Sequence, residues 1–170
     1  MNKSLTQIRT LYKISLEIGR SLNLYEMLRT SINAYLKNLE CDSCIVYQYK
    51  HSGKSAIVAE MIFSIPYTLI VKNLYSEIEQ LIPESFSEAS LSAYRSNLPI
   101  KGNHKEEFFF HILDLPDFGF LMLIKNEKYL ADEVLRNLED INAKLAFSCI
   151  SCINYEDLEI GNGSDAMRLY

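Results

Sequence analysis

EEFFFHILDLPDFGFLMLIKN, residues 106–126, holds the two strongest strand signals in the sequence. Its two apolar runs flank Pro116 and Asp117, a pair that suits a tight turn. The second run, residues 118–124, is apolar on both of its alternating faces. That pattern is expected of a central strand that is covered on both sides. The stretch therefore predicts two adjacent strands in the middle of a sheet.

A second strand pair is predicted upstream, as a hairpin over residues 43–65. CDSCIVYQYK (residues 41–50) is rich in β-branched and aromatic residues, HSGK follows as a turn, and SAIVAEMIFSI supplies the return strand. Pro66 ends this hairpin, and apolar residues spaced by three and four predict a helix from about Thr68 to Pro83. Residues 84–105 are compatible with a short helix or a loop, with a turn at Gly102 and Asn103.

Helices are predicted at both ends of the chain. Residues 1–40 carry two amphipathic segments, the second of which starts at the N-cap residue Asn23. A long helix is predicted from about Asp132 to Leu158, with Gly161 and Gly163 ending it. The order of elements predicts an α+β fold with a largely antiparallel sheet.

The composition narrows the class of protein further. The chain has 170 residues, of which 48% are hydrophobic and 23% charged, and its formal charge is −5. These values favour one packed domain over residues 1–158, with residues 159–170 as a tail or the start of a linker to a downstream domain. The acidic balance disfavours a general nucleic-acid binder. We find neither a membrane span nor a signal peptide, which predicts a cytoplasmic protein.

The C-terminal third resembles the GAF family of small-molecule and redox sensor domains. There the sequence is FFFHILDLPDFGFLMLIKNEKYLADEVLRNLEDINAKLAFSCISCINYEDLE, residues 108–159. The strand pair with a short turn, the acidic helix start and the long apolar helix are typical of that family. With the opening helices and the CIVYQY strand, the resemblance covers about residues 5–158. It implies a GAF-like fold, related to PAS, and more narrowly the N-terminal sensor region of a bacterial histidine kinase.

Two ligand-specific GAF subtypes can be compared with this sequence. The cyclic-nucleotide subtype carries an Asn-Lys pair, a Phe and an Asp-Glu pair near the last strand. Here the Asn-Lys pair is interrupted (Asn126 and Lys128), Tyr129 replaces the Phe, and the spacing to Asp132 and Glu133 differs. No cysteine lies in a bilin-attachment motif. We therefore infer neither cyclic-nucleotide nor bilin binding, and the sequence predicts no cofactor.

Four cysteines form two C-x-x-C pairs, Cys41 with Cys44 and Cys149 with Cys152. Such pairs can hold zinc or an iron–sulfur cluster. Here the second pair falls on the apolar stripe of a helix, and the GAF resemblance places the two pairs roughly 25 Å apart at 1.5 Å per residue. We favour buried structural thiols, with a redox sensor or a metal site as alternatives. The GAF-fold methionine sulfoxide reductase uses cysteines in its central segment, and residues 66–110 contain none.

A ligand pocket is predicted on one face of the first hairpin. Alternation places Tyr47 and Tyr49 on the face opposite Cys44 and Val46. His111 lies in an aromatic strand, either as a core histidine with a hydrogen-bond partner or as a pocket residue. In the alternative interpretation, these aromatic side chains fill the core and leave no pocket. The predicted pocket residues are Tyr47, Tyr49, Met61, Phe63, Tyr67 and His111.

The sequence shows no phosphate-binding glycine loop, nucleophile elbow or metal-ligand spacing, so we expect no catalytic residue and no metal. The expected function is that of a non-catalytic sensory domain, which binds a small ligand, dimerises, or both, to control an output domain. The predicted partner is a second copy of the chain. A protein-interaction module without a ligand, or a thiol-based redox sensor, is the alternative. The residues predicted to pair two protomers are Ile8, Leu11, Ile18 and Leu22.

Overall fold

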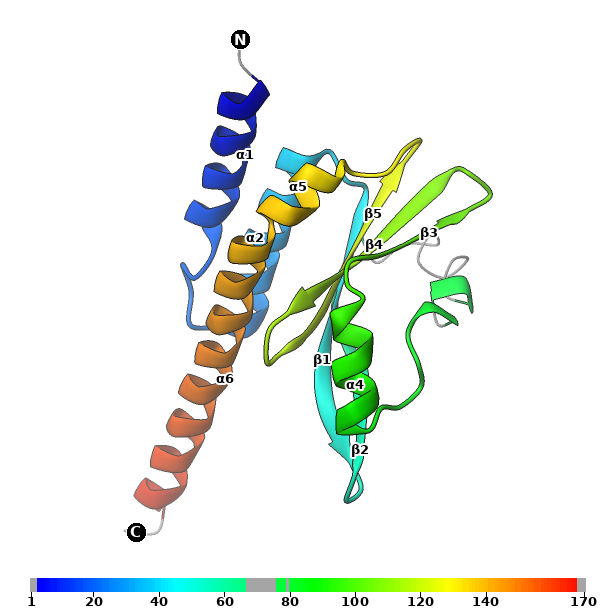
Figure 1. The fold of residues 1–170 in the computed structure, drawn as a ribbon. Coiled ribbons are helices and arrows are strands. Elements are labelled where there is room, and N and C mark those ends of the chain that lie inside the picture. Colours follow the sequence, from blue (N-terminus) through cyan, green and yellow to red (C-terminus); the bar gives the residue numbers. More distant parts are fainter. Residues whose placement is uncertain (1–2, 67–75, 79, 168–170) are drawn as a thin grey trace.

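The structure, a computed structural model, describes residues 3–66, 76–78 and 80–167. Within them lies a five-stranded antiparallel sheet in the order β2-β1-β5-β4-β3 (Figure 1). Both predicted strand pairs and the α+β class are confirmed. The strands are β1 (Ser43–Ser52), β2 (Ala56–Ile65), β3 (Ile100–His104), β4 (Phe108–Leu115) and β5 (Gly119–Asn126).

The β5 strand lies at the centre of the sheet, as its two apolar faces predict. At its start the backbone passes so close to β1 that a Cβ atom on Gly119 would lie 1.8 Å from the Tyr47 carbonyl oxygen. Only glycine fits this approach. The preceding turn closes with the Phe118 N–H donating to the Leu115 carbonyl oxygen, at 3.0 Å.

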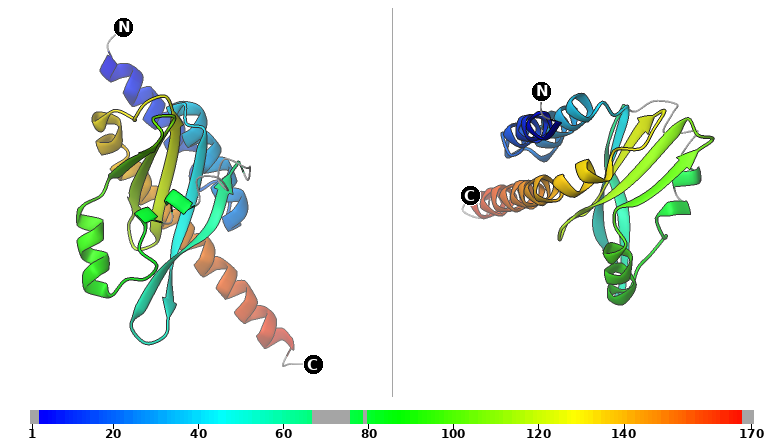
Figure 2. Two further views of the ribbon diagram at one scale, coloured as in Figure 1. Left: turned by 90° about the vertical axis from the view of Figure 1, so that its right-hand side faces the viewer. Right: turned by 45° about the horizontal axis from the view of Figure 1, so that its top comes forward.

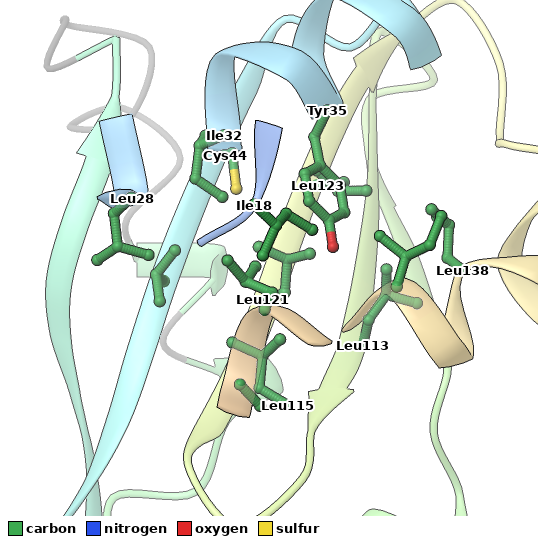
Figure 3. Close-up of a cluster of buried hydrophobic side chains, with 14 of the residues drawn as sticks. Ile18, Leu28, Ile32, Tyr35, Cys44, Leu113, Leu115, Leu121, Leu123 and Leu138 are labelled. Atoms are coloured by element: carbon green, nitrogen blue, oxygen red, sulfur yellow. The ribbon is translucent and has the colours of Figure 1, made fainter. Parts of the chain in front are cut away.

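One face of the sheet is covered by a layer of helices (Figure 2). These are α1 (Lys3–Glu17), α2 (Leu24–Leu39), α5 (Asp132–Asn137) and α6 (Glu139–Met167). Asn23 caps α2 as predicted, with its side chain accepting from the Glu26 N–H. At the other end of α2, the buried Lys125 ammonium donates to the carbonyl oxygens of Leu39 and Glu40, at 3.2 and 2.7 Å. The apolar core beneath this layer includes Tyr35, Cys44 and Leu123 (Figure 3).

The other face of the sheet packs against α4 (Glu88–Ser96) and the residues just before it. A separate apolar core forms there around Phe86, Phe110 and Phe120. An isolated bridge between Ile57 and Phe86 ties the segment that precedes α4 to β2. The sheet therefore separates two cores, and a side chain belongs to one or the other according to its face.

Two expectations about elements are wrong. The C-terminal helix does not stop at Leu158 but continues through Gly161 and Gly163 to Met167, after a break at Leu138. A glycine costs an exposed helix only about 1 kcal/mol, which does not end it. Gly102 and Asn103 lie within β3 rather than in a turn. Most of the helix predicted from Thr68 falls outside the described residues.

Candidate functional site

The tyrosine face is the side of β1 and β2 that carries Tyr47, Tyr49 and Met61. All three side chains belong to the core on the α4 side, whereas Cys44 and Val46 belong to the helix-layer core. The predicted alternation along β1 is therefore confirmed. Met61 is the β2 partner of Tyr47 in the strand register.

Aromatic rings form the floor of the tyrosine face. The Tyr49 ring meets Phe120 edge-on, with centroids 5.2 Å apart, and Tyr94 of α4 meets the same phenylalanine at 5.3 Å. The Tyr94 hydroxyl donates to the Leu81 carbonyl oxygen at 2.9 Å. These contacts fix α4 on the sheet through one shared ring.

The Tyr49 hydroxyl has no hydrogen-bond partner in the described part of the chain, although the oxygen atom is enclosed. Burial, reinforced by the nearby Asp114 carboxylate, raises the pKa of Tyr49 well above its ordinary value. The hydroxyl therefore stays protonated and able to donate. Buried hydroxyls in proteins usually have partners, so an unpaired one marks a position where a ligand atom could bind.

Phe63 does not lie on the tyrosine face, and its predicted place there is wrong. The register of β1 and β2 shifts between Val46 and Tyr47, which leaves Ile62 as an extra residue in β2. Such a bulge interrupts the alternation of side chains along a strand. Phe63 consequently lies in the helix-layer core, where its ring meets Tyr25 at 5.6 Å.

His111 likewise faces the helix layer and not the tyrosine face, so the expected grouping with Tyr47 is wrong. Its Nε2 atom accepts from the Leu130 N–H at 2.9 Å, and its Nδ1–H donates to the Leu123 carbonyl oxygen at 3.2 Å. The side chain is fully buried, and burial lowers the pKa of His111 to about 4. Both ring nitrogens are thus used to join β5 to the segment before α5.

Tyr67, the remaining predicted pocket residue, lies outside the described residues. Four hollows lined by described residues lie elsewhere, three of them around α1 and one at the start of α6. None of these four includes any of the six predicted pocket residues. Of the six, the structure brings together Tyr47, Tyr49 and Met61.

The helix residues predicted to pair two protomers divide into two groups. Ile8 and Leu22 are more than half exposed, whereas Ile18 is a core residue and Leu11 packs partly against the core. The expectation of one shared stripe is therefore wrong for Ile18 and Leu11. Both stripes of α1 are apolar, so sequence alone could not indicate which of them faces inward. The outward stripe of α1 consists of Leu5, Ile8, Tyr12 and Leu16.

The α6 helix has exposed apolar residues of its own. Phe147 and Ile160 are 72% and 71% exposed, and Leu158 is 66% exposed. Figures 1 and 2 show the second half of α6 running past the edge of the sheet. With the outward stripe of α1, these residues make up what we term the terminal-helix surface.

The four cysteines are free thiols. Cys44, Cys149 and Cys152 are almost fully buried, and Cys41 is half-buried. The expected wide separation of the two pairs is wrong for Cys44 and Cys149, which share one core and both act on the pKa of Tyr35. Among the described residues, no three His, Cys, Asp or Glu side chains form a group that could hold a metal.

Neither a protein-family model nor a curated protein matches the sequence. Among solved structures, the chain is similar to the GAF domain of a phosphoenolpyruvate-protein phosphotransferase from Acinetobacter. The TM-score is 0.58 at 16% identity, over 92% of this chain and 99% of that one. A GAF domain of the same type of enzyme from Coxiella burnetii gives 0.53 at 14% identity, with the same coverage. These likenesses show that the chain has the GAF fold.

In the part of the chain that the structure describes, every helix is too short or too polar to cross a membrane.

Proposed function

We propose that this chain, with its GAF fold, is a non-catalytic regulatory module of a bacterial signal-transduction protein. Two copies pair through the terminal-helix surface, and a small ligand binds on the tyrosine face. The observation that carries the proposal is the form of α6. This helix of 29 residues starts in the core and runs past the sheet with apolar side chains exposed.

Pairing is the simplest way to cover these side chains. Four large apolar residues form an exposed row on α1, and Phe147, Leu158 and Ile160 are exposed on α6, which is apolar surface that a monomer rarely leaves in water. The α1 helix lies on the outer side of the helix layer, against α2 and α6, and the second half of α6 runs past the sheet (Figure 2). A second copy could therefore bind there without disturbing either core.

Ligand binding is supported by the tyrosine face. It offers aromatic walls and one unpaired hydroxyl, on Tyr49, which is the mixture typical of small-molecule sites. A protein-interaction module without a ligand remains the second candidate. It is favoured by the close packing of Phe86, Tyr94 and Phe120 on part of this face.

The parent protein is proposed to carry an output domain that α6 controls. A histidine kinase is the first candidate from the sequence, and a phosphoenolpyruvate-protein phosphotransferase is the second from the names of the two similar structures. The four free thiols agree with a reducing compartment, so we place the module in the cytoplasm.

Pairing is tested by the double variant Ile8→Gln and Tyr12→Gln, with Arg9→Gln and Lys13→Gln as the matched control. All four side chains are exposed on α1, and only the first two belong to the outward stripe. Sedimentation velocity should show a dimer for the wild type and the control, and a monomer for the stripe variant. A monomeric wild type, or two variants that behave alike, would contradict the pairing.

The ligand face is tested by Tyr49→Phe. Removing an unpaired buried hydroxyl should raise the free energy of unfolding by about 1 kcal/mol, since no hydrogen bond is lost. Urea denaturation measures this change. A fall in stability would mean that the hydroxyl has a partner within the protein and is not free to bind a ligand.

A further inference from the structure

A half-open hollow of about 270 Å³ lies at the start of α6. Three parts of the chain meet there: the end of β4 with its turn, the residues that follow α4, and the junction of α5 and α6. The hollow is separate from the tyrosine face, and nothing in the proposed function uses it. Its apolar wall is formed by Leu98, Leu113 and Leu135.

Asn142 lines this hollow and has an unused hydrogen-bond donor. Its side chain is only 3% exposed, and its Oδ1 atom accepts from the Tyr35 hydroxyl at 2.8 Å. The Nδ2 amide group donates to no atom in the described residues. The fully enclosed unpaired atoms in the described residues are those of Ser43 and Tyr49, so the Asn142 amide is not among them, and Asn142 lines the hollow. This amide group is a hydrogen-bond donor, so it can pair with an acceptor oxygen of a molecule in the hollow.

The charges around the hollow leave one carboxylate free. The Arg95 guanidinium binds both oxygens of Asp114, at 3.0 and 2.9 Å, so these two groups satisfy each other. Glu139 also lines the hollow, is exposed and has no ion pair in the described structure. The lining of the hollow therefore includes a donor on a buried side chain and an exposed carboxylate without an ion pair in the described residues.

We propose that this hollow binds a small zwitterion, a molecule with a carboxylate and an ammonium group on a short alkyl chain. The carboxylate accepts from the Asn142 amide, the ammonium binds the Glu139 carboxylate, and the alkyl chain packs on the leucine wall. A simple anion would be repelled by Glu139, and a simple amine would leave the amide unpaired. Because Asn142 and Glu139 lie in the first turn of α6, the ligand would act directly on that helix.

The test is a titration of the full chain with L-norvaline, followed through the side-chain amide signal of Asn142 by NMR. Butylamine and pentanoate are the comparison probes, since each lacks one of the two charged groups. At up to about 10 mM, L-norvaline should shift the signal, and each comparison probe should bind about tenfold more weakly. No shift with L-norvaline, or equal binding of all three probes, would overturn the proposal.

A matched pair of variants tests the role of Glu139. Glu139→Gln should weaken L-norvaline binding by about tenfold, and Glu133→Gln should leave it unchanged. Both glutamates are exposed, so neither change threatens folding, and only Glu139 lines this hollow. Equal effects of the two variants would overturn the proposal. The readout does not depend on assembly, so failure here would leave the pairing of protomers unaffected.

Discussion

His111 shows how one buried side chain makes a fold sensitive to acid. The neutral ring accepts from one backbone N–H and donates to one backbone carbonyl, which leaves no place for a second proton. Burial is the main cause of its lowered pKa, and the nearby Lys101 and Lys125 add to it. The sequence left open a core histidine or a pocket residue, and the structure shows a core histidine with a partner for each ring nitrogen.

Stability should therefore fall as the pH drops from about 6.5 towards 4. In that range the unfolded histidine binds a proton and the folded one, with a pKa of about 4, does not. The loss reaches about 3 kcal/mol at the acid end, given 1.36 kcal/mol per pKa unit.

Urea unfolding at a series of pH values measures this loss. His111→Gln keeps an acceptor but cannot titrate, so the variant should be less stable at pH 7 and should have a flatter pH profile. Identical profiles for the wild type and the variant would contradict the assignment.

At the scale of elements, the sequence predicted the two N-terminal helices, the strands β1, β2, β4 and β5 and the C-terminal helix, but it failed at three places. The bulge opposite Val46 and Tyr47 cannot be read from one strand, because it depends on the register between two. That is why Phe63 was assigned to the wrong face. The strand at Ile100–His104 is short and polar, and it forms only because Gly102 and its neighbours pair with β4.

The third failure was at Gly161, where the sequence predicted the end of a helix. In the structure Gly161 is helical, with open space around its missing side chain, whereas Gly53 has equally open space but a φ of +72°. The two glycines therefore differ in backbone conformation and not in crowding.

Alanine at these two positions should have opposite effects. Gly161→Ala should slow amide hydrogen exchange in the second half of α6, in line with a gain of about 1 kcal/mol in helix propensity. Gly53→Ala should lower the free energy of unfolding by about 1 kcal/mol, because a left-handed backbone disfavours alanine. Faster exchange in α6 of the first variant would show that the helix needs its glycine.

At the scale of the whole molecule, the sheet divides the protein into two cores, and three of the four thiols lie in the one beneath the helices. Burial raises the pKa of every cysteine, with that of Cys41 at about 12. Thiolates are therefore scarce in the folded protein at neutral pH, and reagents reach the inner thiols only when the helix layer opens.

Labelling with Ellman's reagent tests this at pH 8. The folded protein should react slowly at Cys41 and hardly at all at the other three, while four thiols should react at once in urea. The variant Cys41→Ser should then remain almost unlabelled in its folded form. Rapid labelling of a buried cysteine would instead support the thiol-sensor alternative.

The length of α6 has a mechanical consequence. A helix of 29 residues is roughly 44 Å long at 1.5 Å per residue. If its first turn is taken as a pivot, a tilt of about 5° there displaces the far end by roughly 4 Å, more than the rise of two residues along the helix. A tilt at the start of α6 that is too small to disturb either core would therefore produce a much larger displacement at the C-terminal end of the helix.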